Sequence, residues 1–219
     1  MTLLFIHSPF PGCGKTMAAN YLCQHHGFQR VSFADALRNV GRLILSQLGY
    51  STEEIKFYLT TGKEQIIPGM RVTGRSLLQK LGTEFGRNMI DDKIWLRSFA
   101  YLCDKIQREG INRREGVRLV CDDLRFPNEF DYAQHVGGRT VWLSRNSAVP
   151  KKPAAPLFLQ NLVWNISPLR KLLLHFFTFN HPSNNALKGR EWEFDYVLTN
   201  NSTEVDLFRT LDMLIEELE

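Results

Sequence analysis

The feature that most constrains the fold of this chain lies near its start, where an apolar run leads directly into a glycine-bearing loop. Residues 3–6 are Leu-Leu-Phe-Ile, which is the composition of a buried strand. They are followed by Pro9-Phe10-Pro11-Gly12-Cys13-Gly14-Lys15-Thr16 and then by an amphipathic run at 17–23. Strand, glycine loop and helix in this order are the context that a phosphate-binding loop requires.

The residue types of this loop predict how it would hold a nucleoside triphosphate. Backbone N–H groups of a tight loop and of a helix N-terminus point at phosphate oxygens. Lys15 would reach the β- and γ-phosphates, and the Thr16 hydroxyl would bind Mg²⁺. Pro9 stands where a first glycine is usual, so a chance Gly-Lys-Thr in an ordinary loop is the alternative. The predicted nucleotide-binding residues are Gly12, Cys13, Gly14, Lys15, Thr16 and Met17.

Length and composition indicate a soluble globular protein. The chain has 219 residues, of which 43% are hydrophobic and 23% charged, so one domain with a substantial core is expected. The four cysteines show neither metal-ligand nor disulfide spacing, which favours reduced thiols. Cys13 is either a space-filling residue of the loop or a reactive thiol. No cleavage signal and no membrane-spanning apolar run are present, so we expect a cytoplasmic protein without stable membrane insertion.

Apolar strands alternate with helical patterns along the chain. This alternation predicts an α/β fold with a central parallel five-stranded sheet and helices on both faces. The expected strands are 2–7, 30–33, 117–121, 140–143 and 194–199. The expected helices include 34–48, 73–90, 91–109, 128–136 and 204–218.

Acidic residues follow two of the expected strands, at the sheet edge where ligands gather in parallel α/β folds. Asp122 and Asp123 end the strand at 117–121, as a metal-anchoring Walker-B acid would; alternatively one of them caps the next turn. Arg125 follows in a turn, where it either forks onto phosphate or forms a structural salt bridge. Asp35 is either a site residue or an acid favoured by the dipole of its helix.

Arginines surround the expected helix at 73–90. Arg71, Arg75 and Arg87 flank it, and Gln79 lies one turn after Arg75 on the same face. Guanidinium groups and a carboxamide can grip a monophosphate and read a base edge. Ordinary exposed arginines are the alternative.

Positive charge is concentrated in one segment. Residues 145–190 contain seven Lys or Arg and no Asp or Glu, which leaves −3 for the rest of a chain whose net charge is +4. Such asymmetry suggests an anionic partner, with a solvated basic loop as the alternative. The segment lacks the repeated aromatic–basic interleaving of nucleic-acid-binding proteins, so we expect no nucleic-acid partner.

Several segments together resemble the deoxynucleoside monophosphate kinases of bacteriophages, within the P-loop kinase superfamily. The resemblance lies in residues 32–38, 75–84, 90–95, 123–129 and 195–201, and it covers nearly the whole chain outside about 145–180. The strings at 78–84 and 123–129 are its more specific parts. The resemblance implies ATP-dependent phosphorylation of deoxynucleoside monophosphates to diphosphates on a three-layer fold, in the host cytoplasm if the chain is of phage origin.

Carried over position by position, the resemblance implies roles for individual residues. Lys15, Asp35, Arg125 and Arg145 would be catalytic, with Thr16 and Asp123 on Mg²⁺. The implied substrate-binding residues are Asp35, Arg38, Arg71, Arg75, Gln79 and Asp123. A single domain would comprise a core at 1–33, 115–144 and 192–219, a substrate-binding helical part at 34–114 and a lid at 145–191.

The chain departs from the resemblance at three places. The loop reads Gly-Lys-Thr where Gly-Lys-Asp-Thr is frequent, Asn184 stands where a lid glutamate is expected after His181-Pro182-Ser183, and 146–180 has no counterpart. A dephospho-coenzyme-A-kinase-like enzyme and a non-catalytic nucleotide-binding regulator are the alternative functions. A homodimer formed through the insert or an outer helix is one alternative for assembly.

Overall fold

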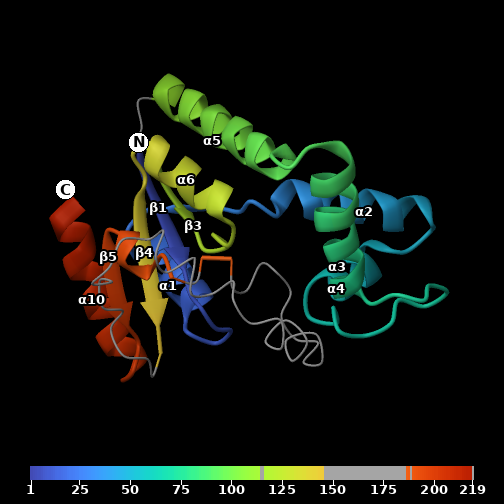
Figure 1. Cartoon of the computed structure of the whole chain (residues 1–219), viewed down its shortest axis with the longest axis horizontal. Helices are drawn as coiled ribbons and strands as arrows, with labels where there is room; N and C mark the ends of the chain where they lie inside the picture. Colours follow the sequence, from blue (N-terminus) through green and yellow to red (C-terminus); the bar gives the residue numbers. More distant parts are fainter. Residues whose placement is uncertain (114–115, 146–185, 188, 219) are drawn as a thin grey trace, which may run out of the picture. The chain divides into compact units, whose positions relative to one another are not determined.

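The computed structural model describes residues 1–113, 116–145, 186–187 and 189–218. Within them a five-stranded sheet has the order β2-β3-β1-β4-β5 (Figure 1). Its strands are β1 (Thr2–His7), β2 (Gln29–Val31), β3 (Arg118–Cys121), β4 (Arg139–Ser144) and β5 (Tyr196–Thr199). β1 pairs with β4 and β4 with β5, both in parallel, as the alternation of strands and helices predicts. The expected parallel α/β sheet is confirmed.

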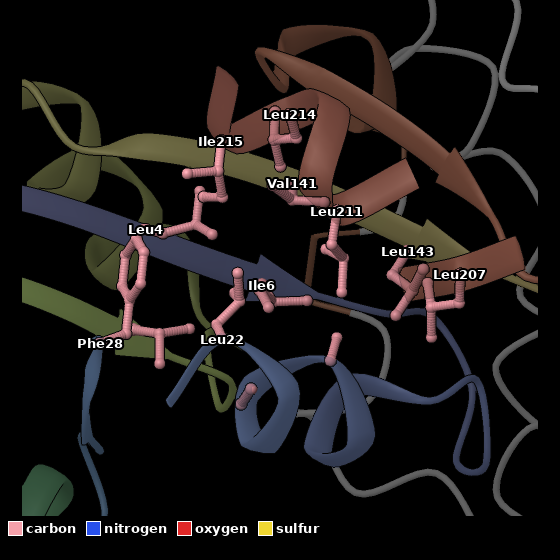
Figure 2. Close-up of a cluster of buried hydrophobic side chains, with 13 residues drawn as sticks. Leu4, Ile6, Leu22, Phe28, Val141, Leu143, Leu207, Leu211, Leu214 and Ile215 are labelled. Atoms are coloured by element: carbon pink, nitrogen blue, oxygen red, sulfur yellow. The ribbon is translucent and has the colours of Figure 1, made fainter. Parts of the chain in front are cut away.

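Two helices cover one face of this sheet. α1 (Lys15–His25) and α10 (Glu204–Leu218) pack against alternate residues of β1 and β4, because successive side chains of a strand point to opposite faces. Figure 2 shows how these side chains interdigitate between strands and helices. The buried cluster includes Leu4, Ile6, Leu22, Val141, Leu143, Leu207, Leu211, Leu214 and Ile215.

The opposite face of β1 and β4 packs against aromatic side chains. α6 (Pro127–His135) supplies Phe130, whose ring lies 4.6 Å from that of Phe194. Trp142 of β4 meets Phe194 edge-on at 5.3 Å and lies 4.8 Å from the His7 imidazole. Helices on both faces therefore make the three layers that were expected.

Five other helices form a unit with its own core. They are α2 (Asp35–Gln47), α3 (Thr52–Leu59), α4 (Gly74–Gln79), the π-helix η1 (Lys80–Ile90) and α5 (Ile94–Arg113). Ser51 caps α3 through a reciprocal capping box with Glu54, and the Thr73 hydroxyl caps α4. The core of this unit contains Leu45, Ile55, Leu59, Ile67 and Leu77.

The structure corrects the helix expected at 73–90. From Lys80 onward it is a π-helix, and the Trp95 indole N–H donates to the Gly82 carbonyl at 2.8 Å. A Cβ on Gly86 would lie 2.6 Å from the Trp95 ring, so glycine permits this close packing. The following helix begins at Ile94 and not at 91, because Asp91 is extended and its carboxylate accepts from the Lys93 N–H at 2.9 Å.

Two strands have other bounds than expected, because side chains at their ends form hydrogen bonds with main-chain groups. β2 stops at Val31, because the Ser32 N–H donates to the Asp35 carboxylate at 3.0 Å and forms a turn. β5 begins at Tyr196 and not at 194, since the Asp195 carboxylate binds both the N–H and the hydroxyl of Thr140 at 2.8 Å.

The chain divides into two compact units, residues 31–119 and residues 2–30 with 120–219. The first corresponds to the helical part expected at 34–114; that the two act as one kinase domain stays a prediction. Most of the expected lid lies outside the described residues, including the basic insert at 146–180, His181-Pro182-Ser183 and Asn184. Among the described helices, none has the length and apolarity needed to cross a membrane.

Candidate active site

The glycine loop between β1 and α1 has the backbone that phosphate binding needs. Gly12 and Gly14 have φ angles of 81° and 100°, which disfavour residues with a Cβ. α1 begins at Lys15, directly after Gly14, so its unpaired N–H groups open onto the loop. Consecutive N–H groups and a helix N-terminus together form a site for anions.

Lys15 is held at the loop by Ser8. Its ammonium group donates to the Ser8 hydroxyl at 2.9 Å, and that hydroxyl in turn donates to the Phe10 carbonyl at 2.7 Å. Burial lowers the pKa of Lys15, and the nearby Arg125 guanidinium lowers it further. An anion bound here would relieve both effects, because it would restore a counter-charge to a partly desolvated cation.

Asp122 is the carboxylate beside the loop. Its side chain is buried, and Thr16 Oγ1 donates to its Oδ2 at 3.1 Å. Arg30 of β2 binds both carboxylate oxygens, through Nε at 2.9 Å and Nη2 at 2.7 Å. A hydroxyl and a carboxylate in contact are hard oxygen ligands of the kind that Mg²⁺ uses together with nucleotide phosphates.

The structure therefore changes the acid that fits a metal site. The family resemblance implied Asp123 together with Thr16, but the described contact of Thr16 is with Asp122. The Asp123 carboxylate instead accepts from the Cys121 thiol at 3.1 Å. Neighbouring residues at a strand end point in different directions, and the sequence alone left both acids open.

Arg125 lies on a loop whose main chain is fixed at several points. The His7 imidazole donates through Nδ1 to the Leu124 carbonyl at 2.8 Å. The buried Glu129 carboxylate accepts from the N–H groups of Arg125 and Phe126, at 2.8 and 3.0 Å. In the part of the chain that the structure describes, no carboxylate pairs with the exposed Arg125 side chain. The salt-bridge alternative for Arg125 thus finds no support there.

Asp35 and Arg38 form a second group, within the helical unit. The Asp35 carboxylate accepts from Arg38 Nη1 at 2.9 Å and from the Ser32 N–H at 3.0 Å. Arg38 Nη1 also reaches the Ser32 hydroxyl at 3.1 Å. Because Asp35 is the first residue of α2, its position also suits an acid at a helix N-terminus, so the two interpretations of Asp35 coexist.

The other predicted substrate residues do not form one group of mutual contacts. Arg75 is paired with Glu64, through Nε at 2.6 Å, and Gln79 is half-buried at the end of α4. Arg71 is exposed, and Arg87 Nη1 reaches the Asp92 carbonyl at 3.4 Å. Arg145 is exposed immediately after β4.

Sequence reasoning missed four residues of the site. Ser8 contacts Lys15, Arg30 contacts Asp122 and Asn200 contacts Cys13, while His7 contacts the carbonyl of Leu124, next to Arg125. Nothing in the local sequence marks Arg30 or His7, since their partners lie 92 and 117 residues away. The Asn200-Asn201 turn was part of the family resemblance, but no role was attached to it.

Comparison with known proteins gives one curated sequence relative. It is a protein of Acanthamoeba polyphaga mimivirus named "Putative deoxynucleotide monophosphate kinase", 29% identical over 140 residues that cover 61% of this chain and 69% of the relative. No family model matches the chain.

Solved structures with a similar course of the chain include two bacterial proteins. Dephospho-CoA kinase from Campylobacter jejuni gives a TM-score of 0.47 at 12% identity, covering 100% of this chain and 97% of its own. TT1252 from Thermus thermophilus gives 0.44 at 17% identity, covering 100% and 98%. Likeness at this level carries no information on substrate.

The resemblance expected from the motifs is thus confirmed by an independent relative. The chain is therefore similar in sequence to a protein that bears the name of this kinase class, and its parallel sheet has helices on both faces and a glycine loop after β1.

Proposed function

We propose that this protein transfers the γ-phosphoryl group of ATP to a deoxynucleoside monophosphate. The observation that carries the proposal is the group of charges at the glycine loop. Lys15 and Arg125 lie close enough for one to lower the pKa of the other, and the adjacent Thr16 hydroxyl is bonded to the buried Asp122. Cations beside a nest of N–H groups are what phosphoryl transfer needs for charge neutralisation.

The loop would bind the donor. Gly12, Cys13, Gly14 and Met17 would offer backbone N–H groups to ATP phosphates, and Lys15 would exchange Ser8 for a phosphate oxygen. Thr16 and Asp122 would hold Mg²⁺, which when bound neutralises the β- and γ-phosphates. Arg125, on a fixed main chain, would place its guanidinium on the transferred group.

The acceptor would be held by residues of the helical unit. An acceptor phosphate is already anionic at neutral pH, so orientation matters more than a strong general base. Asp35 would orient Arg38, whose remaining N–H groups can bind the acceptor phosphate. Arg71, Arg75 and Gln79 would add contacts, with Arg75 leaving Glu64 for the substrate. Arg145, which follows β4, would contribute charge on the donor side. The named relative and the strings at 78–84 and 123–129 support this class of acceptor.

A coupled ADP-release assay tests the proposal. Purified protein with ATP and Mg²⁺ is offered each deoxynucleoside monophosphate, each ribonucleoside monophosphate and dephospho-coenzyme A. We expect ADP release that depends on one or more deoxynucleoside monophosphates. ADP release that depends only on dephospho-coenzyme A would instead indicate a dephospho-coenzyme-A-kinase-like enzyme. Nucleotide binding without any acceptor-dependent release would identify a regulator.

A further inference from the structure

We propose that Asn200 is a positioning residue that sets the phosphate loop in its binding conformation through the Cys13 carbonyl. The proposal rests on the proposed function only in requiring that the loop bind a nucleotide. Asn200 comes directly after β5, while the loop follows β1, so the two are 187 residues apart in sequence.

Asn200 is held both by its side chain and by its main chain. Its Nδ2 donates to the Cys13 carbonyl at 3.0 Å, and its backbone N–H donates to the Ser144 carbonyl at 2.8 Å. Asn200 and Cys13 are both buried, so water does not compete freely for either group. A carboxamide anchored in this way holds the carbonyl in one direction.

The direction of that carbonyl matters because the peptide unit is planar and trans. In such a unit the C=O of Cys13 and the N–H of Gly14 point in opposite directions. By drawing the Cys13 carbonyl toward itself, Asn200 directs the Gly14 N–H away from itself. The direction of the Gly14 N–H is thereby set before any ligand binds. This lowers the conformational-entropy cost of ordering the loop when a nucleotide binds.

Gly14 is shaped by the same contact. A Cβ on Gly14 would lie 2.6 Å from Asn200 Nδ2, closer than real side chains approach. The glycine therefore serves two needs at once, a φ of 100° and room for the Asn200 carboxamide. The loop and the turn after β5 form one unit of function, although they were separate motifs in the sequence.

Three substitutions test this role, with affinity for a fluorescent ATP analogue in the presence of Mg²⁺ as the first readout. Asn200→Ala removes the donor, and we expect its Kd to rise roughly tenfold, as loss of a buried hydrogen bond implies. Asn200→Asp puts an acceptor against a carbonyl and is expected to weaken binding more. Asn88→Ala removes a carboxamide from an exposed position of η1 and serves as the control, with Kd expected to change less than about twofold.

The KM for the monophosphate distinguishes positioning of the phosphate loop from a general structural role of Asn200. We expect KM for ATP to rise in Asn200→Ala while KM for the monophosphate stays the same. Equal weakening of both, or an unchanged Kd for the ATP analogue in a folded Asn200→Ala variant, would overturn the proposal. If Asn200→Ala does not fold, Asn200→Ser is measured in its place. Serine keeps a donor of shorter reach, so we expect its Kd for the ATP analogue to rise by less than in Asn200→Ala. An unchanged Kd in a folded Asn200→Ser variant would overturn the proposal. Because the analogue binds without an acceptor, absence of kinase turnover in the wild type would defeat the proposed function without affecting this test.

Discussion

At the scale of single residues, the site is organised by long-range contacts to a few buried polar groups. Asp122 receives three hydrogen bonds, two from Arg30 and one from Thr16, in a nearly dry position. A buried carboxylate needs such partners, because an unpaired charge in the interior is costly. Arg30 therefore supplies a counter-charge to the buried Asp122 carboxylate and holds it beside Thr16.

Removing Arg30 should therefore destabilise the protein. Arg30→Met leaves Asp122 without its ion pair, and after allowance for the 41% exposure of the Arg30 side chain we expect a loss of about 1–2 kcal/mol in the free energy of unfolding. Urea denaturation measures it. Arg209→Met is the matched control, since Arg209 pairs with the exposed Asp206 at 3.8 Å and its loss should cost less than about 0.5 kcal/mol. Equal effects of the two substitutions would show that Arg30 does not stabilise Asp122.

His7 should make stability depend on pH. Burial lowers the pKa of His7 from 6.5 to about 4, while its Nδ1–H holds the Leu124 carbonyl. The unfolded chain then binds a proton between these values and the folded chain does not, so stability is full above pH 6.5 and falls as the pH drops towards 4. The loss attributable to His7 at pH 5 is about 2 kcal/mol relative to pH 8.

His7→Asn tests this dependence, because the asparagine amide can donate to the same carbonyl but does not titrate. The free energy of unfolding from urea curves at pH 8 and pH 5 should fall less in the variant than in the wild type. A parallel fall in both proteins would mean that other groups control the acid limb.

At the scale of elements, the π-helix η1 is the feature most tightly specified by packing. We predict that Gly86→Ala destabilises the protein by about 2 kcal/mol or more, because the added Cβ would lie 2.6 Å from the Trp95 ring and 2.9 Å from the Leu81 carbonyl. Gly116→Ala is the control, since a Cβ there would meet nothing within 4 Å. Thermal unfolding compares the two, and similar melting temperatures would contradict the packing account.

The helices and strands also show which parts of the structure can be predicted from sequence patterns. The strand at 2–7 and the helix at 204–218 have the bounds that were expected, because strong apolar periodicity and clear turn residues delimit them. The π-helix was not foreseen, since it depends on the fit of Gly82 and Gly86 to Trp95, which no period of hydrophobicity encodes. The same limit applies to the site: the loop was predictable from a local motif, whereas Arg30 and the choice of Asp122 over Asp123 arise from strand neighbours distant in sequence.

At the scale of the whole molecule, the chain places its candidate groups in two units with separate cores. The glycine loop, Asp122 and Arg125 lie in one unit, and Asp35 and Arg38 lie in the other. We predict that Arg38→Ala raises KM for the monophosphate at least about tenfold, as loss of a charged hydrogen bond implies, with unchanged affinity for an ATP analogue. Calorimetric titration with the analogue checks the second part. Loss of both affinities would contradict the assignment of donor and acceptor to different units.

The measurement that tests the central claim most directly follows the phosphoryl group itself. The protein is incubated with ATP labelled at the γ-phosphate, Mg²⁺ and a mixture of deoxynucleoside monophosphates, and the products are separated. We predict labelled deoxynucleoside diphosphates from the wild type and none from a folded Lys15→Ala variant, because Lys15 is the cation held at the loop by Ser8. Label found only in free phosphate, or diphosphates made equally well by Lys15→Ala, would contradict the account.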